Sequence, residues 1–321
     1  MSRQEQSNIC IETKNIKRYY PFQGNKTLKA LDGVSIEVKE GVVYGIVGES
    51  GCGKSTLGKC MMRLQTLTDG KVFFRGQDIS HQSRKELRPL LSQMQMVFQN
   101  PYSSFNPKLK LGYSLREPCR INGMKKEEIE NRIQELLSYI SLTENELDRF
   151  PHELSGGQLQ RLAIARALLL KPGFIVADEP VSALDVSVQA QILNLILDLK
   201  EAFHTTMLFI SHDMTVVEHI CDEVAVMYLG RVVESGKTNI LFRNLLHPYT
   251  QALMSAIPVI DPMGEGSKRI LLTGDIPTAV DVPKGCRFAS RCSVCMQCCR
   301  EEEPELVMVE EGHYVACHRY R

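Results

Sequence analysis

The sequence has no excess of charge of either sign and no features of a membrane-spanning or exported chain. Lys and Arg number 38 and Asp and Glu number 38 among 321 residues, so the formal net charge is +0. No overall basic charge therefore favours nucleic acid as the main partner. There is no apolar run long enough to cross a membrane, and the polar start Met1–Asn8 has no signal-peptide core. We expect a cytosolic chain that binds no nucleic acid and is long enough for a large domain with an extension.

Cysteines are numerous for a chain expected to remain reduced. The sequence has 11 of them, and a cluster of reduced cysteines indicates a metal before it indicates disulfides. Five are scattered and are interpreted as ordinary small apolar residues: Cys10, Cys52, Cys60, Cys119 and Cys221. The remaining six all follow Gly285.

The chain is organised around a glycine-rich loop, Gly48–Thr56, which follows the apolar run Val42–Val47. The spacing G-x-x-x-x-G-K-S between a predicted strand and a predicted helix is typical of a loop whose backbone N–H groups surround a phosphate. Lys54 would reach the outer phosphates, the Ser55 hydroxyl would bind Mg²⁺, and the helix dipole would point at the same anion. A glycine-rich turn without a ligand is the alternative. The residues predicted to contact nucleotide are Gly48, Ser50, Gly51, Cys52, Gly53, Lys54, Ser55 and Thr56.

Strand-like segments flank this loop. Residues 9–47 alternate in the manner of an antiparallel lead-in, in which the aromatic pair Tyr19 and Tyr20 could either stack on an adenine base or pack on the sheet. Residues 70–79 predict a hairpin, and residues 95–98 predict a short buried strand that ends at Gln99. The loop that follows Gln99 is rich in turn formers and can carry a moving contact.

The next segments predict helices and a second anion site. Apolar residues recur at helical spacing from Lys125 to Leu142, as in a surface helix of a helical subdomain. The segment Leu154–Arg161 then places two glycines before another helix. Because a helix start exposes N–H groups and a positive dipole end, this segment predicts a second site for an anion.

Two carboxylates end a predicted buried strand, Phe174–Ala177. Because neighbouring strand residues point to opposite sides, Asp178 would hold Mg²⁺ and Glu179 would deprotonate a water. A solvated turn is the alternative. Beyond them, Asp185 lies near the cap of a predicted helix, and His212 follows an apolar strand at the end where α/β sheets place ligand groups.

Together these motifs resemble those of the nucleotide-binding subunit of an ABC transporter, over about residues 9–260. The resemblance implies an α/β fold, a P-loop NTPase ABC ATPase core with a mixed sheet, the antiparallel β lead-in and a helical subdomain. The ATPase domain would span residues 1–245, with the helical subdomain at about 100–165. A small cysteine-rich extension would follow at 246–321.

The resemblance also implies a role for each motif residue in ATP hydrolysis. Two subunits would meet head to tail, so that each ATP lies between one phosphate loop and the other chain's signature. The implied catalytic residues are Glu179, His212 and Gln99; the implied Mg²⁺ ligands are Ser55, Gln99 and Asp178; Tyr20 would stack on adenine. The signature residues Ser155, Gly156 and Gly157 would serve the partner's ATP, and Gln158 and Asp185 are also assigned to the nucleotide.

The C-terminal part narrows the resemblance to the ATPases of oligopeptide, dipeptide and nickel importers. His247–Leu253 and Gly285–Phe288 look like their C-terminal extension. Its four-cysteine order is matched by Cys286, Cys292, Cys299 and Cys317, and some members hold an iron–sulfur cluster there. Thiolates suit a [4Fe–4S] cluster or zinc, and reduced cysteines without metal are a third possibility. Cys295 and Cys298 add C-x-x-C pairs, which could shift the ligand set.

The resemblance implies an ATPase that energises import of di- and oligopeptides from the cytoplasmic face of the membrane. Residues 155–168 look like the F-type ATPase subunit, so the expected partners are a D-type ATPase, two permeases and, indirectly, a solute-binding protein. Nickel or a metal chelate is the alternative cargo. A soluble ABC ATPase in translation or repair is a second hypothesis, and a redox sensor built on the cysteines is a third.

Overall fold

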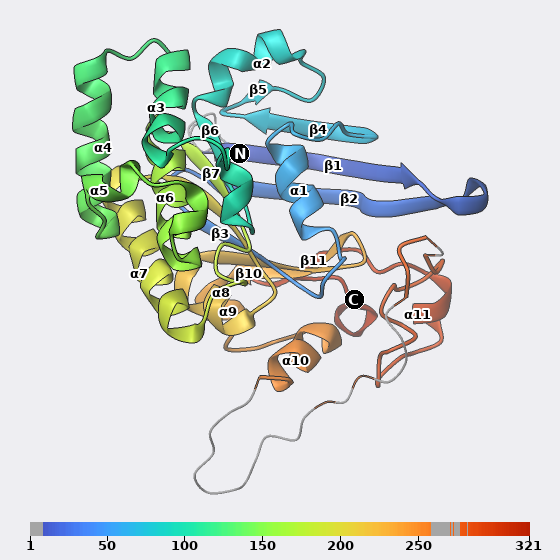
Figure 1. Cartoon of the computed structure of the whole chain (residues 1–321). Coiled ribbons are helices and arrows are strands. Elements are labelled where there is room, and N and C mark those ends of the chain that lie inside the picture. The colour runs from blue at the N-terminus through green and yellow to red at the C-terminus, as the bar shows by residue number, and fades with distance from the viewer. Residues whose placement is uncertain (1–8, 258–269, 271, 273–276, 281) are drawn as a thin grey trace, which may run out of the picture. The chain divides into compact units, whose positions relative to one another are not determined.

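A computed structural model describes residues 9–257, 270, 272, 277–280 and 282–321, so the polar start Met1–Asn8 lies outside the described residues. The chain divides into two compact units, whose helices and strands are drawn in Figure 1. Unit 1 comprises Met1–Ile11, Glu37–Val42 and Phe73–Ile210, and unit 2 comprises Glu12–Ile36, Val43–Val72 and Ser211–Arg321.

Unit 1 contains three parallel strands in the order β6-β7-β8. They are β6 (Met94–Val97), β7 (Phe174–Asp178) and β8 (Thr206–Ser211), paired in register from Phe174 opposite Met94 and Thr206. Every residue of β7 and β8 is buried, which explains their unbroken apolar runs. The parallel strands predicted around Asp178 are therefore present.

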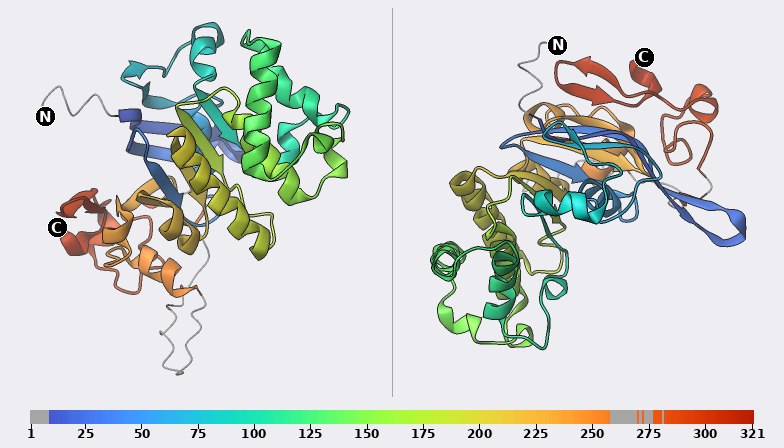
Figure 2. Two further views of the ribbon diagram at one scale, coloured as in Figure 1. Left: turned by 90° about the vertical axis from the view of Figure 1, so that its left-hand side faces the viewer. Right: turned by 90° about the horizontal axis from the view of Figure 1, so that it is seen from above.

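The helices of unit 1 include α4, the helix that the amphipathic pattern from Lys125 to Leu142 predicted. They are α2 (Arg84–Leu91), α3 (Leu111–Ile121), α4 (Lys126–Ile140), α5 (Glu144–Leu147), α6 (Gly156–Leu168) and α7 (Val186–Phe203), with 3-10 turns η3 (Pro101–Ser104) and η4 (Pro151–Glu153). Helix α4 buries Ile129, Ile133, Leu136, Leu137 and Ile140. It packs against α3, α6 and α7, so these helices form one bundle in both figures (Figures 1 and 2).

Unit 2 contains most of the lead-in sheet and a second sheet. In the lead-in, β1 (Ile9–Pro21) lies between β2 (Thr27–Lys39) and β4 (Asp69–Phe74), and the short β5 (Gln77–Asp78) completes the hairpin with β4. The second sheet runs in the order β3-β9-β10-β12-β11. Its strands are β3 (Val43–Val47), β9 (Glu223–Tyr228), β10 (Arg231–Lys237), β12 (His313–Val315) and β11 (Val307–Glu310), and only the β3–β9 pair is parallel.

Short helices complete unit 2. They are α1 (Lys54–Met61), α8 (Met214–Ile220), α9 (Thr238–Leu241), α10 (Pro248–Ser255) and α11 (Cys298–Glu301), with 3-10 turns η2 (Gln23–Asn25) and η5 (His318–Tyr320). Helix α8 packs on β3. None of the described helices is long and apolar enough to cross a membrane.

A buried carboxylate fastens the C-terminal part of unit 2 to β10. Glu234 is fully buried and accepts hydrogen bonds from the backbone N–H groups of Leu246 (2.8 Å) and His247 (3.0 Å). It also lies 2.9 Å from Nε2 of His313 on β12. Residues beyond 245 therefore pack on the same sheet as β9 and β10, and the domain boundary at residue 245 stays a prediction.

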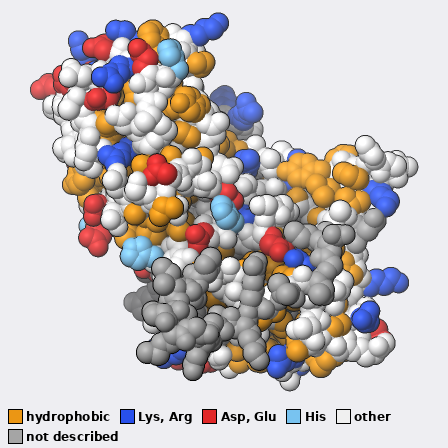
Figure 3. Space-filling view, turned by 60° about the horizontal axis from the view of Figure 1, so that its bottom comes forward, with side chains coloured by type: hydrophobic (Ala, Val, Ile, Leu, Met, Phe, Trp, Pro, Cys, Tyr) orange, Lys and Arg blue, Asp and Glu red, His pale blue; other side chains and the backbone are white. Residues whose placement is uncertain are grey.

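The surface carries charges of both signs. Figure 3 shows Lys and Arg side chains interspersed with Asp and Glu side chains on the face it presents. This agrees with the balanced composition. That the chain binds no nucleic acid remains a prediction.

Candidate nucleotide and cysteine sites

The glycines of the phosphate loop are required by close backbone contacts. The loop leaves the end of β3, whose five residues are all buried. A Cβ atom on Gly48 would lie 2.2 Å from the Met227 carbonyl oxygen, and one on Gly53 would lie 2.3 Å from the Ala30 carbonyl oxygen. Gly53 also has a φ of +108° immediately before α1, a conformation that side chains disfavour. The sequence spacing of the motif therefore follows from how tightly the loop is enclosed.

Lys54 lies inside the loop that it was predicted to serve. Its side chain is buried, and Nζ donates hydrogen bonds to the carbonyl oxygens of Gly48 (2.7 Å) and Glu49 (3.1 Å). Ser55 and Thr56 follow in the first turn of α1 and are half-buried. The loop thus brings an ammonium group and a hydroxyl to the start of a helix, where an anion is favoured.

The other loop residues divide into exposed and buried ones. Ser50 and Gly51 are exposed. Cys52 is buried, and burial raises the pKa of its thiol. A neutral buried thiol has little chemistry to offer, so Cys52 contributes to the site through its backbone and its packing.

Glu49 ties this loop to the C-terminal part of unit 2. Its two carboxylate oxygens accept hydrogen bonds from the Arg291 guanidinium at 2.8 and 3.0 Å. Its backbone N–H donates to the Tyr249 hydroxyl at 2.8 Å. Sequence reasoning missed all three residues, because the pattern G-x-x-x-x-G-K-S leaves position 49 open.

In unit 1 the predicted base and the predicted glutamine lie together. Nε2 of Gln99 donates to the Glu179 carboxylate at 3.0 Å and to the Ser182 hydroxyl at 3.2 Å. Glu179 has a φ of +47°, an unusual value for a residue with a side chain and one that functional sites tend to retain. Asp178 is the last residue of β7 and is buried. Glu179 is half-buried. Because Glu179 lies beyond the end of β7 and has a positive φ, the alternation of strand residues does not determine the direction of its side chain.

The signature segment begins α6 with a reciprocal cap. The Ser155 hydroxyl accepts from the backbone N–H of Gln158 (3.3 Å), and the Gln158 side chain accepts from the backbone N–H of Ser155 (3.1 Å). This capping box leaves Ser155 and Gly156 exposed. A Cβ atom on Gly157 would lie 2.6 Å from the Val188 side chain of α7, so Gly157 is required for this packing.

Asp185 caps α7 beside the signature segment. Its carboxylate accepts from the Ser187 hydroxyl (2.7 Å) and the Val188 backbone N–H (3.0 Å). These two hydrogen bonds lower the pKa of Asp185. Unit 1 thus brings the signature, Asp185 and α7 together in one place.

His212 and Tyr20 belong to unit 2. His212 is exposed and directly follows β8, before the cap of α8. Tyr20 is half-buried, and its ring lies 4.5 Å from the guanidinium carbon of Arg18, while its hydroxyl donates to Gln65 at 2.6 Å. The neighbouring Tyr19 is instead hydrogen-bonded through its hydroxyl to Asp32.

Four of the clustered cysteines line one cavity in unit 2. They are the four predicted ligands, Cys286, Cys292, Cys299 and Cys317, and the remaining lining includes His247 and Phe288. Burial raises the pKa of the Cys286 thiol to about 12, and burial lowers the pKa of His247 to about 4. Across the described part of the chain, no group of three or more His, Cys, Asp and Glu has an arrangement that could hold a metal ion.

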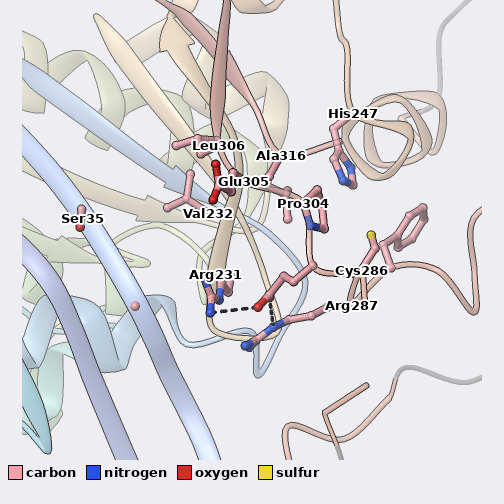
Figure 4. Close-up of a pocket in the computed structure, with 14 residues that line it drawn as sticks. Ser35, Arg231, Val232, His247, Cys286, Arg287, Pro304, Glu305, Leu306 and Ala316 are labelled. Carbon is pink, nitrogen blue, oxygen red and sulfur yellow. Dashed lines mark hydrogen bonds and ion pairs between the residues drawn. The ribbon is translucent and has the colours of Figure 1, made fainter. Parts of the chain in front are cut away.

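A larger cavity, about 370 Å³, is also lined by Cys286 (Figure 4). In it, the Glu303 carboxylate lies 3.0 Å from the guanidinium groups of both Arg231 and Arg287. Arg287 also reaches the buried Asp32 carboxylate at 2.5 Å. Arg231, Arg287 and Glu303 of this lining are thus held in ion pairs.

Comparisons with known proteins agree with this geometry. A model of the ABC transporter family matches residues 31–182, and a model of the oligopeptide/dipeptide transporter C-terminal region matches residues 233–299. The chain is 47% identical over 319 residues to the oligopeptide transport ATP-binding protein AppF of Bacillus subtilis (strain 168), covering 97% of both chains. It is 44% identical over 314 residues to the di/tripeptide transport ATP-binding protein DppF of Pseudomonas aeruginosa, covering 96% of this chain and 97% of that one.

Solved structures share the fold. The dimeric ATP-binding cassette MJ0796 bound to ADP and phosphate is 31% identical, with a TM-score of 0.65 over 71% of this chain and 98% of that one. The protein cbiO1 from Clostridium perfringens, part of an ABC transporter complex, is 27% identical, with a TM-score of 0.66 over 74% of this chain and 92% of that one.

The fold and its loops thus define an α/β P-loop ATPase. The chain belongs to the ABC transporter family and is an ATP-binding-cassette ATPase whose C-terminal part is of the oligopeptide/dipeptide transporter type.

Proposed function

We propose that this chain hydrolyses ATP to energise the import of di- and oligopeptides through a binding-protein-dependent ABC transporter. The observation that carries the proposal is similarity along nearly the whole chain to ATP-binding proteins named for oligopeptide and di/tripeptide transport. The match includes the C-terminal region that bears the name of such transporters. Nickel or a metal chelate, the alternative cargo, has no comparable support among these relatives.

The phosphate loop of unit 2 is proposed to hold the ATP phosphates. Backbone N–H groups of Gly48–Thr56 and the Lys54 ammonium would neutralise phosphate charge, and Tyr20 would stack on the adenine base. Mg²⁺ is a hard cation that prefers oxygen ligands, and we propose the Ser55 hydroxyl, the Asp178 carboxylate and the Gln99 amide oxygen as its ligands. The metal would offset charge on the transferred phosphoryl group.

Glu179 is proposed as the general base that deprotonates the attacking water. The 3.0 Å hydrogen bond from Gln99 supports this role, because it holds the carboxylate in one orientation without neutralising it. His212 would contact the phosphoryl group that leaves. Such positioning and charge neutralisation is most of what phosphoryl transfer requires from a protein.

The signature is proposed to act on ATP bound by a second ATPase subunit. Ser155 and Gly156 are exposed at the start of α6, where a helix dipole favours an anion. Gly157, Gln158 and the capping residue Asp185 would complete this surface. We propose a D-type ATPase as the second subunit, so that the working unit is a heterodimer.

Membrane partners follow from the same proposal. Two permeases would bind the ATPase pair on the cytoplasmic face of the membrane, and a solute-binding protein would deliver peptide on the other side. The loop after Gln99 is the proposed contact, since Tyr102 on η3 is 46% exposed and an exposed aromatic ring suits a protein interface. The helical subdomain, at about 100–165 within an ATPase domain of 1–245, would carry this loop.

The cysteine-rich extension, residues 246–321, is proposed to hold a [4Fe–4S] cluster, with zinc as the alternative. Four thiolates are the usual ligand set of such a cluster, and Cys286, Cys292, Cys299 and Cys317 line one cavity. Their present arrangement among the described residues is not that of a metal site, so binding would require the four thiols to move closer together. Burial raises the pKa of the Cys286, Cys292 and Cys317 thiols. Since ligands must lose their protons, metal binding here would release protons and would weaken as the pH falls.

Purification with candidate partners tests this function. The tagged chain, co-expressed with a D-type ATPase and two permeases, should be recovered from detergent extracts as one complex whose ATPase rate rises with peptide-loaded solute-binding protein. A rise with nickel-loaded protein alone would instead favour metal import. Recovery of ribosomes in place of permeases would contradict the proposal.

A further inference from the structure

The phosphate loop contains a carboxylate that nucleotide binding alone does not explain. Glu49 directly follows Gly48, and its carbonyl oxygen accepts from the Lys54 ammonium at 3.1 Å. A carboxylate in a loop that binds a triphosphate would repel it, because like charges destabilise each other. The loop therefore needs a partner that neutralises Glu49.

Arg291 is that partner. Nη1 and Nη2 donate to the two Glu49 oxygens at 2.8 and 3.0 Å, the bidentate geometry that makes such pairs strong. Arg291 is only 8% exposed, and Nη1 also lies 3.4 Å from the Tyr228 hydroxyl. It lies 242 residues from Glu49 in the chain, within the cysteine-rich extension.

Tyr249 holds the backbone of the same residue. Its hydroxyl accepts the Glu49 N–H at 2.8 Å, and the side chain is fully buried against the rings of Tyr228 (4.6 Å between centroids) and Phe288 (5.4 Å). A ring locked in this way has no freedom to release the bond. The Glu49 N–H is consequently directed to the extension.

We propose that Arg291 and Tyr249 are positioning residues for ATP, through which the C-terminal extension holds the phosphate loop and neutralises Glu49. The proposal rests on the nucleotide site proposed above. Arg291 acts through charge, since without it an unpaired carboxylate faces the triphosphate. Tyr249 acts through the backbone, since without its hydroxyl the Glu49 N–H loses its acceptor.

The charge role predicts an unusual order of affinities among variants. In Arg291→Gln the carboxylate is left unpaired, so ATP should bind about tenfold more weakly than in the wild type. In Glu49→Gln no carboxylate is left to repel ATP, so any loss of ATP affinity should be smaller than in Arg291→Gln. The double variant Glu49→Gln/Arg291→Gln should therefore bind ATP more tightly than Arg291→Gln alone. Arg300→Gln, an exposed arginine of the same segment, is the matched control and should bind like the wild type.

The measurement is the dissociation constant of a fluorescent ATP analogue for the full chain, with thermal unfolding recorded for each variant. A purely structural role for Arg291 predicts that ATP affinity follows thermal stability through the whole series of variants, and that result would overturn the proposal. Equal affinity of Arg291→Gln and Arg300→Gln would also overturn it. Lys54→Ala distinguishes a failure of this proposal from a failure of the proposed nucleotide site. If Lys54→Ala binds ATP like the wild type, the nucleotide site itself is wrong.

A second variant keeps the proposal testable if Arg291→Gln does not fold. Tyr249→Phe keeps the ring packing and removes only the hydroxyl, so it should weaken ATP binding severalfold. Because it acts through the backbone, this loss should persist in a Glu49→Gln background. Tyr320→Phe is its control, because the Tyr320 hydroxyl donates to the Leu246 carbonyl oxygen at 3.2 Å and does not contact the loop. Equal affinity of Tyr249→Phe and Tyr320→Phe would contradict the role of Tyr249.

Discussion

The side-chain amide of Gln99 donates a 3.0 Å hydrogen bond to the carboxylate of Glu179. The two residues are 80 positions apart in the chain, one after β6 and the other after β7, whose parallel pairing brings them together. This contact joins the residue proposed to deprotonate water to the start of the loop proposed to contact the membrane subunits. Movement of that loop would therefore change the orientation of the base.

Replacing Glu179 tests its role as the base. Glu179→Gln keeps the size of the side chain and a group that can bond Gln99, but it cannot accept a proton. We expect ATP hydrolysis to fall by about 10²-fold or more, with ATP affinity unchanged. Steady-state hydrolysis and equilibrium nucleotide binding measure the two effects. Hydrolysis within about threefold of the wild-type rate would contradict the assignment.

Replacing Gln99 tests the coupling. Gln99→Ala removes one hydrogen bond that orients the Glu179 carboxylate, so we expect a smaller loss of hydrolysis than in Glu179→Gln, together with loss of stimulation by peptide-loaded solute-binding protein. Ser182→Ala removes the other partner of Gln99 and should retain stimulation. Full stimulation in the Gln99→Ala complex would show that the loop transmits nothing through this contact.

The proposed contact of Ser155 with the partner's ATP can be tested separately from its role as a helix cap. Ser155→Ala removes the cap of α6, and Ser83→Ala removes a matching capping box at α2, so each should lower the free energy of unfolding by about 1 kcal/mol. Only Ser155→Ala should lower hydrolysis by the assembled transporter, by about 10²-fold if its hydroxyl contacts the partner's ATP. Similar activity of the two variants would indicate that Ser155 is only a cap.

The cysteines predict a pattern of metal loss. Cys286→Ser removes a thiol of the shared cavity and should abolish the visible absorption and the iron content of anaerobically purified protein. Cys295→Ser alters a cysteine that does not line that cavity and should retain both. A content of one zinc per chain in place of iron would favour the zinc site over the [4Fe–4S] cluster. Metal loss in Cys295→Ser with retention in Cys286→Ser would reverse the ligand assignment.

The buried pair of His313 and Glu234 predicts a dependence of stability on pH. Burial alone lowers the pKa of His313, but its hydrogen bonds and charge attraction to Glu234 and Glu310 outweigh burial and raise this pKa above its ordinary value of 6.5. The stabilisation is therefore complete below pH 6.5 and is lost as the pH rises through the folded-state pKa. Urea unfolding at several pH values above 6.5 should show this loss, and His313→Gln should flatten it. An unchanged slope in His313→Gln would contradict the pair's role.

Local patterns in the sequence predicted much of the ATPase fold. The apolar period of α4 reflects one buried face, and the unbroken apolar run of β7 reflects burial on both faces. In both elements the local pattern agrees with the burial that the fold imposes. The glycine spacing at Gly48 and Gly53 identified the loop, because close backbone contacts permit no other residue. The capping box at Ser155 and Gln158 follows the pattern S-x-x-Q before a helix, which indicates a helix start from the sequence alone.

Long-range partners could not be predicted in this way. Nothing near Glu49 in the sequence indicates Arg291 or Tyr249, since these contacts depend on how β9, β10 and α10 pack. The hydrogen bonds of the buried Glu234 could not be predicted either, because its position in the sequence is that of an ordinary polar residue in a strand. Which cysteines share a cavity likewise depends on how the loop folds, because spacing in the sequence does not exclude Cys295 and Cys298 as ligands.

Uptake of labelled dipeptide into proteoliposomes tests the central claim most directly. The vesicles would contain this chain, the partner ATPase and both permeases, with ATP on the side of the ATPases and loaded solute-binding protein on the other. We predict uptake that requires ATP, is abolished by Glu179→Gln in this chain and is not replaced by nickel uptake. ATP hydrolysis that proceeds without peptide accumulation, or that drives only nickel into the vesicles, would contradict the account.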